Sequence, residues 1–260
     1  TDAQTYTITA TGGSDTLKSF SGTVTLDATD TDTVTVKTGA ADTPLEIDGA
    51  FAADNATSLT ITTSHSDSHI TFGGATMATA DLLETVTVSA GGGGVTADDS
   101  DITVGAIGAT VAAGVLANMT ITAADGADVT MGAIDAEGAS MTKLQADANT
   151  TGSVITFGTI GVSTTQITSI GEINLSAVSG ATVDLAGHIY ATTIGTITAS
   201  GAGTINMDAT TSVITTIEQF NAGSTSGTVA VDFTGATVAI TTTLGTGTNS
   251  YITGVGGDTI

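Results

Sequence analysis

Two short stretches rich in aspartate are the first residues of this chain that could do chemistry. They are DATDTD, residues 27 to 32, and ADDSD, residues 97 to 101. Ca²⁺ takes roughly six to eight oxygen ligands from carboxylates and backbone carbonyls, and short acidic turns supply both. We therefore expect calcium ligands at five aspartates, namely Asp30, Asp32, Asp98, Asp99 and Asp101. The alternative is that both stretches are solvated turns without a metal.

A third stretch, HSDSH at residues 65 to 69, brings two of the three histidines close to an acid. If the stretch is a strand, alternation places His65, Asp67 and His69 on one face, about 7 Å apart in steps. Imidazole and carboxylate groups at that spacing could bind a transition metal. An exposed polar edge is the alternative interpretation.

Other kinds of chemistry find little support. The chain has no cysteine, so it has no disulfide, no thiolate metal site and no thiol nucleophile. The run GGGG at 91 to 94 is not followed by the Lys and Ser/Thr that a phosphate-binding loop requires. Glycan lyases on β-helices need Lys or Arg to neutralise uronate charge, but this chain holds only three Lys and no Arg. We expect no enzymatic activity.

The charge balance excludes whole classes of partner. The chain carries 26 acidic residues against three lysines, for a formal net charge of −23. Nucleic acids and anionic membrane surfaces both require clusters of Lys and Arg, so we expect neither as a partner. No apolar run approaches the roughly 18 residues of a membrane span, so we also expect no membrane insertion. Divalent cations would relieve the repulsion within such a chain.

The elements that must position these residues are visible in a motif that occurs seven times. Its copies are HITFGGA (69 to 75), DITVGAI (101 to 107), DVTMGAI (128 to 134), VITFGTI (154 to 160), TVDLAGH (182 to 188), TINMDAT (204 to 210) and AVDFTGA (230 to 236). The fourth residue of each copy is apolar: Phe72, Val104, Met131, Phe157, Leu185, Met207 and Phe233. The second residue is apolar as well, so both face the same side of a strand. Repetition of such strands at a period of about 25 residues indicates a solenoid.

Each copy follows another alternating run, and in several repeats a third, weaker apolar run precedes both. Examples of the third run are GVLANM (114 to 119), QITSIG (166 to 171) and VITTIE (213 to 218). We therefore predict an all-β fold, a right-handed parallel β-helix with three short strands in each coil. About ten coils, each roughly 4.8 Å high, would form a rod on the order of 50 Å long with outward Thr, Ser and Asp in polar ladders. The competing fold is a pair of antiparallel β-sandwich domains, which would lack a column of matching residues at a fixed long period.

The last 17 residues, LGTGTNSYITGVGGDTI at 244 to 260, have a shorter period of nine. At that offset Gly245 matches Gly254, Gly247 matches Gly256, Asn249 matches Asp258, and Tyr251 matches Ile260. This stretch resembles the glycine- and aspartate-rich nonapeptide of the RTX family of secreted proteins, G-G-x-G-x-D-x-U-x, where U is a large apolar residue. Leu244 and Thr253 replace the first glycine of the family pattern.

The resemblance implies a calcium-binding β-roll with Asn249 and Asp258 among its ligands and the U residue in its core. It also implies a division into a solenoid domain, residues 1 to 243, and the start of RTX-like repeats, residues 244 to 260, in a segment of a longer chain. The Cys-free, Arg-free remainder is similar to surface-layer proteins and large adhesins that share this export route. The resemblance therefore places the protein outside the cell, at the cell surface.

We expect a structural extracellular protein, a subunit of a surface layer or filament that self-assembles with divalent cations. Its partners would be other copies of itself and a cell-envelope glycan. The alternatives are an adhesin stalk, a phage or host-binding spike, and a glycan-active β-helix enzyme. A spike should show a strongly apolar third face, and an enzyme should show paired acids in one groove.

Overall fold

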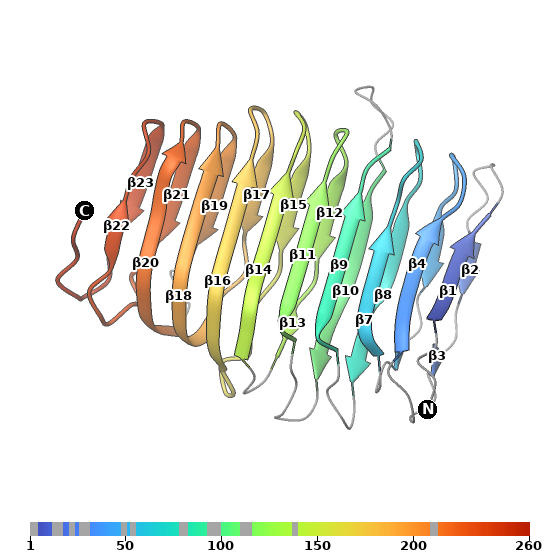
Figure 1. Ribbon diagram of the computed structural model, residues 1–260, viewed down its shortest axis with the longest axis horizontal. Helices are drawn as coiled ribbons and strands as arrows, with labels where there is room; N and C mark the ends of the chain where they lie inside the picture. Colours follow the sequence, from blue (N-terminus) through green and yellow to red (C-terminus); the bar gives the residue numbers. More distant parts are fainter. Residues whose placement is uncertain are drawn as a thin grey trace.

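The chain folds into a parallel β-solenoid made of two facing sheets (Figure 1). This computed structural model describes residues 5–11, 18–20, 24–25, 32–47, 51–52, 56–77, 83–92, 100–109, 116–136, 140–208 and 213–260. Within these ranges every regular element is a strand and every strand pair is parallel. No helix that could cross a membrane occurs in the described part of the chain. The predicted all-β solenoid is therefore confirmed.

The two sheets contain strands that alternate along the chain, so each coil contributes one strand to each sheet. The first sheet is β1 (Thr5–Ala10), β4 (Asp32–Thr38), β7 (Ala56–Thr62), β9 (Thr85–Ala90), β11 (Asn118–Ala123), β14 (Ser140–Ala148), β16 (Ile167–Ala177), β18 (Tyr190–Gly201), β20 (Val213–Thr225) and β22 (Thr241–Thr243). The second is β2 (Lys18–Phe20), β5 (Leu45–Ile47), β8 (Ile70–Met77), β10 (Ile102–Ala109), β12 (Asp128–Met131), β15 (Val154–Phe157), β17 (Thr182–Leu185), β19 (Thr204–Asp208), β21 (Thr228–Asp232) and β23 (Thr248–Ile252), with β3 (Val24–Thr25), β6 (Phe51–Ala52) and β13 (Ile134–Asp135) beside it. The predicted number of about ten coils is approximately right.

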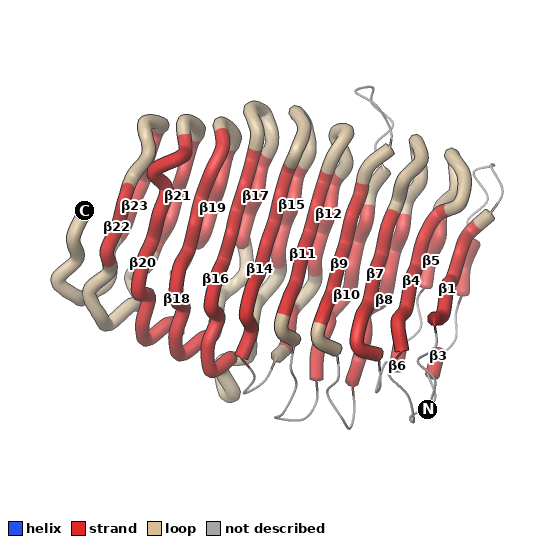
Figure 2. Tube along the Cα trace, in the orientation of Figure 1, coloured by secondary structure: helices blue, strands red, loops and turns tan. Residues whose placement is uncertain are grey.

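The predicted third strand of each coil is not a separate element in the later coils. The run at 166–171 lies in the first half of β16, and the run at 213–218 begins β20. Ile170 and Ile173 are both buried although they are three residues apart, which strict alternation would not allow. The strand bends at the exposed Gly171 between them, and Figure 2 shows the long strands of the first sheet curving at their lower ends. The third apolar run therefore lines the corner of a two-sheet coil.

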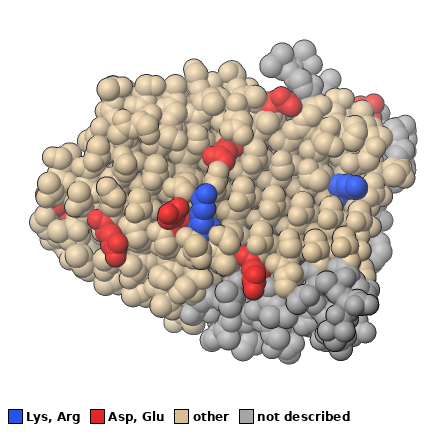
Figure 3. Space-filling model, in the orientation of Figure 1, with Lys and Arg blue, Asp and Glu red and all other residues tan. Residues whose placement is uncertain are grey.

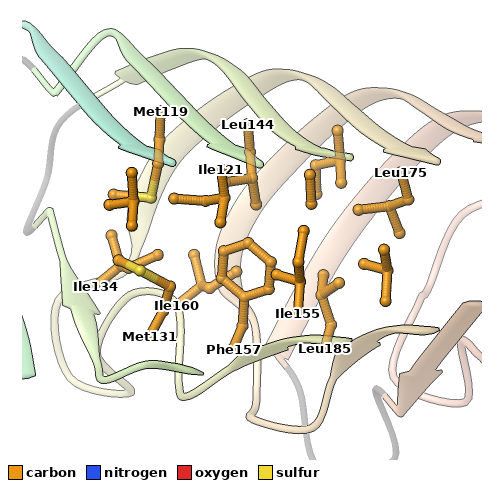
Figure 4. Packing of buried hydrophobic residues seen from close by; sticks show 14 of the residues in the cluster. Met119, Ile121, Met131, Ile134, Leu144, Ile155, Phe157, Ile160, Leu175 and Leu185 are labelled. Carbon is orange, nitrogen blue, oxygen red and sulfur yellow. The ribbon is translucent and has the colours of Figure 1, made fainter. Parts of the chain in front are cut away.

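The core consists of apolar columns that run along the solenoid axis. Met131 pairs with Phe157, and Phe157 pairs with Leu185, as the repeated motif predicts. Figure 4 shows these side chains pointing from the second sheet toward the side chains of the first. The prediction is wrong in the last copy, where Val231 rather than Phe233 continues the column by pairing with Met207.

The register of the last copy differs because Phe233 has another place in the core. It lies just after β21 and is buried, with its ring 5.5 Å from that of Phe220 in the first sheet and 5.7 Å from that of Tyr251 in the last coil. An edge-to-face cluster of this kind is favourable beyond the area that it buries. The aromatic cluster therefore fills the C-terminal end of the core, and Val231 takes the ladder position.

Small side chains form the column where the first sheet enters its turns. Ala90, Ala123, Ala148 and Ala177 stack in consecutive coils and are all buried. The chain reverses toward the second sheet directly after these residues, so the space between the sheets narrows there. Alanine at this position permits the short turns that carry the polar groups described next.

Candidate functional site

The turns that lead from the first sheet to the second carry acidic residues in four coils of the N-terminal half, whereas the described turns after β14, β16, β18 and β20 carry none. We call Asp42, Asp67, Asp101, Asp125 and Asp128 the acidic edge, because they lie in or next to the turns after β4, β7, β9 and β11. Asp42, Asp67 and Asp125 have positive φ angles of 52°, 52° and 58°. Aspartate tolerates this left-handed conformation better than most residues, so the turns favour it locally.

His69 is the centre of the densest polar cluster on this edge. Its Nε2 lies 3.1 Å from Oδ1 of Asp67, and its Nδ1 lies 3.6 Å from Oδ2 of Asp101 in the next coil. The three side chains are each a little over two-fifths exposed, so water screens their interaction. A single imidazole thus lies between two carboxylates from neighbouring coils.

The predicted strand over the HSDSH stretch is wrong, because residues 65 to 67 form a turn. His65 contacts Ser64, with 3.2 Å between Nδ1 and the hydroxyl oxygen, while His69 contacts Asp67. Because of this turn, His65 and His69 do not share one face of a strand, and each has its own neighbours. The sequence predicts Asp101 as a calcium ligand, whereas the structure places it beside His69. Asp101 also accepts a hydrogen bond of 2.9 Å from the Asp128 backbone N–H.

Buried hydroxyl groups tie the turns of neighbouring coils together beneath this cluster. The Ser68 hydroxyl donates to the carbonyl of Ala40 at 2.9 Å, and the Ser100 hydroxyl donates to the carbonyl of His65. Both serines are fully buried, so these bonds satisfy polar groups that would otherwise be costly. The acidic edge therefore rests on a rigid, hydrogen-bonded base.

The aspartates predicted to bind calcium in the two acidic stretches are only partly described. Asp101 belongs to the acidic edge, as above. Asp32 is the first residue of β4 and pairs with Ala56. Asp30, Asp98 and Asp99 lie outside the described residues. Among the residues that are described, no three His, Asp or Glu side chains converge in a geometry suited to a metal ion.

The other predicted calcium ligands, Asn249 and Asp258, each hold one buried oxygen without a hydrogen-bond partner. Asn249 pairs with Val229 in the second sheet and donates from Nδ2 to the carbonyls of Gly245 at 3.1 Å and Gly247 at 3.0 Å. Its Oδ1 has no partner among the described residues, and the same holds for Oδ2 of Asp258. Oxygen atoms in this condition are suited to accept a proton donor or to ligate a cation.

Asp258 is also linked to the aromatic end of the core. Its Oδ1 accepts a hydrogen bond of 2.8 Å from the Ile240 backbone N–H. Burial raises the pKa of Tyr251, and the charge of Asp258 adds to that rise, while a hydrogen bond of 2.7 Å from the Thr242 hydroxyl opposes it. The predicted core position Tyr251 is partly buried against the core, whereas its match Ile260 is 71% exposed.

A shallow depression of about 470 Å³ lies on the outer face of the second sheet near its C-terminal end. Its polar lining comes from Asp184, Asn206, Asp232 and Ser250, which belong to four successive strands, β17, β19, β21 and β23. Sequence reasoning did not find this depression, because its polar residues are 18 to 26 positions apart and meet only through the pairing of the strands.

The outer face of the first sheet carries few charges. Three outward columns run along it, and their described charged residues are Lys37, Lys143, Asp147 and Glu172. Two positive and two negative groups balance within these columns, and Glu218 of β20 is exposed beside them. Figure 3 shows this face as a largely uncharged surface with a few scattered charges.

No family model, curated protein or solved structure matches the chain.

Proposed function

We propose that the protein is a structural subunit of an extracellular surface layer or filament, and that calcium joins its copies through acidic turns. The observation that carries this proposal is the acidic edge, on which four successive coils, which repeat about every 4.8 Å, place carboxylates along one side of a rod. A rod that presents carboxylates in several successive coils can repeat a contact from copy to copy, which suits a lattice or a filament.

The charge of the edge makes cations the natural link between copies. Two unit charges about 4.8 Å apart repel by about 1 kcal/mol in bulk water, and two such edges brought together would add this repulsion wherever their carboxylates face one another. His69 lies between one such pair, Asp67 and Asp101. A divalent cation would offset the repulsion between carboxylates and would supply a bridge whose ligands come from two copies.

The C-terminal segment supports calcium binding separately. The unpartnered oxygens of Asn249 and Asp258 belong to the two residues that match the ligand position of the RTX nonapeptide. Further repeats stacked on this end would add the carbonyl and carboxylate oxygens that one turn lacks. Both observations favour a scaffold over a catalyst, and the proposal therefore includes no enzymatic activity.

A cell-envelope glycan is a second proposed partner, because the depression on the second sheet offers the right groups. Asp184, Asn206, Asp232 and Ser250 bring carboxylate, amide and hydroxyl oxygens beside the apolar surface of Ile252. Sugar rings combine hydroxyl groups with apolar faces and are recognised by such mixtures. Calorimetric titration with envelope polysaccharide tests this step, and Asn206→Ala should weaken binding if the depression is the site.

Sedimentation velocity and electron microscopy in Ca²⁺, in Mg²⁺ and in chelator at constant ionic strength test the assembly. We expect monomers in chelator and sheets or filaments in millimolar Ca²⁺. The double variant Asp42→Asn/Asp125→Asn should reduce the dependence on Ca²⁺, because asparagine keeps the turn conformation and removes the charge.

The matched control removes the same charge from places other than the acidic edge, Glu84→Gln/Glu172→Gln. Glu84 lies just before β9, at the opposite end of the strand from the acidic edge. Assembly that proceeds equally well with Ca²⁺ and with chelator, or that responds equally to both double variants, would refute the role of the acidic edge.

A further inference from the structure

The N-terminal half of the first sheet presents a two-dimensional lattice of threonine side chains. We call the outward positions of β1, β4, β7, β9 and β11 the threonine array. Its three columns are Thr5, Thr33, Ser58, Thr85 and Asn118; Thr7, Thr35, Thr60, Thr87 and Thr120; and Thr9, Lys37, Thr62, Ser89 and Thr122. Eleven of these fifteen positions are threonine, and the middle column is threonine in all five coils.

The spacing of the array follows from the geometry of parallel strands. Neighbouring coils repeat about every 4.8 Å, and alternate residues on one strand repeat about every 6.6 Å. Thr60, Thr87 and Thr120 are Cα partners in consecutive strands, so their hydroxyl and methyl groups lie on one row. Because threonine is branched at Cβ, its χ1 angle is restricted, and the side chains in a row have few orientations to choose from.

The array is regular in both directions. From Thr33 onward, the pairing of β4 with β7, of β7 with β9 and of β9 with β11 proceeds without a shift. The irregularity between Thr198 and Ser200 in β18 lies beyond the array, toward the C-terminus. Figure 2 shows that successive strands of the first sheet keep nearly the same direction along the solenoid. The array is therefore a nearly flat lattice rather than a strongly twisted one.

The surface chemistry of the array is unusual for this chain. The array contains one charged residue, Lys37, whereas the chain as a whole has 26 acids. The threonines from Thr33 to Thr122 are half-buried, and each carries one methyl and one hydroxyl group on this face. A flat surface with methyl and hydroxyl groups at regular spacing and little charge is suited to hold water in a regular pattern.

We propose that the threonine array binds ice. Its two repeat distances are close to those between oxygen atoms on faces of hexagonal ice, so water held between the threonine rows can merge with the crystal. Ions are rejected by the ice lattice, and a charged face would have to lose its hydration to bind there. With one charged residue among fifteen positions in an otherwise acidic molecule, the array comes close to this requirement. Bound protein would pin the crystal surface and lower the temperature at which the crystal grows.

A second copy of the chain is a poorer occupant of the same face. The array measures about 20 Å by 13 Å from strand spacing and rise, and so covers about 250 to 300 Å². A stable interface buries about 800 Å² on each partner and has an apolar centre. The array is smaller than this, and its described outward residues are polar. Ice, which has the matching repeat and no charge, is the occupant that the geometry favours.

The second sheet provides an internal comparison, because its threonines do not form a lattice. One outward column carries Thr71, Thr103, Thr130 and Thr156, and continues as Asp184. A second threonine column begins only at Thr182, in the coil where the first has ended. From β8 onward each coil therefore presents one threonine in these two columns, so the spacing between threonines on one strand is missing.

Thermal hysteresis and inhibition of ice recrystallisation test the proposal, measured on the intact chain in chelator so that calcium-dependent assembly does not contribute. Thr87→Tyr places a bulky ring at the centre of the array and should remove most of the activity. Thr130→Tyr makes the same change in the ladder of the second sheet and should leave the activity intact. Tyrosine is well tolerated in strands, and circular dichroism and melting curves verify that both variants are folded.

Lys37→Thr provides the opposite test, because it completes the third column. We expect greater thermal hysteresis for this variant and no change for Lys143→Thr, which removes the same charge beyond the array. No thermal hysteresis in the unaltered protein would overturn the proposal, as would equal losses in the two tyrosine variants. Self-association that Thr87→Tyr abolishes, in a protein without ice activity, would instead assign the face to a second copy. Failure of calcium-dependent assembly would leave these measurements unaffected.

Discussion

The core column makes a quantitative prediction at Phe157. This side chain is 1% exposed and lies between Met131 and Leu185 in the ladder of the second sheet (Figure 4). Truncation of a buried phenylalanine to alanine removes its transfer free energy and leaves a cavity, which together cost about 3 to 5 kcal/mol. The neighbours are held by backbone pairing in both directions, so the cavity can collapse only partly. We expect Phe157→Ala to lose stability near the upper end of this range.

The adjacent residue supplies the control. Thr156 points outward and is half-buried between Thr130 and Asp184, so Thr156→Ala should change stability by about 0.5 kcal/mol or less. Thermal melts followed by far-ultraviolet circular dichroism, together with urea titration, measure both variants. For a chain of this size the loss at Phe157 corresponds to a melting temperature lower by on the order of 10 °C. Equal effects at positions 156 and 157 would refute the inward register of the column.

Three further predictions follow from the turns and the C-terminal end. Gly227→Ala should be strongly destabilising in the same melts, because its Cβ would lie 2.0 Å from a backbone carbonyl oxygen of the preceding coil. Gly257→Ala is the control and should be neutral, because a Cβ there would meet no atom within 4 Å. Folding raises the pKa of Tyr251, so the neutral phenol stabilises the fold below the unfolded pKa of 10.0, and this stabilisation is lost as the pH rises through the folded pKa. In melts at different pH, Tyr251→Phe should therefore reduce the loss of stability at alkaline pH. Calorimetry should show weak Ca²⁺ binding at Asn249 and Asp258 in this segment. A chain extended by several nonapeptides should bind Ca²⁺ tightly and melt at a higher temperature. An extended chain that gains neither affinity nor melting temperature would show that the nine-residue period is coincidental.

Much of the architecture could be predicted because a solenoid repeats one simple rule. The apolar alternation in each copy of the motif places the column from Phe72 to Met207 correctly, since each strand pairs with its equivalent in the next coil. The prediction for the last copy is wrong because Val231 and Phe233 share one alternation, so two registers that differ by two residues are possible. Only the aromatic cluster in three dimensions decides which of the two enters the ladder.

The site was harder to predict because it depends on turns and on register rather than on alternation. The HSDSH stretch alternates polar residues as a strand could, but a left-handed Asp67 turns the chain there and separates His65 from His69. Contact between His69 and Asp101 spans 32 residues and follows only from the stacking of coils. The threonine array was visible as outward polar ladders, but its second dimension requires the strand pairing. The sequence alone does not contain that pairing explicitly.

The direction of the ladder hydrogen bonds determines how this rod should respond to mechanical tension. These bonds run along the solenoid axis, so a force that pulls the two ends apart loads the coils in series. Each coil contacts only its neighbours, and an end coil can therefore detach while the rest stays folded. The 26 residues from Met131 to Phe157 would extend by about 85 Å when one coil is released, against about 4.8 Å of folded rod. A tether built from such coils lengthens stepwise under load and recoils as coils re-pair, which would protect whatever it anchors from a sudden pull.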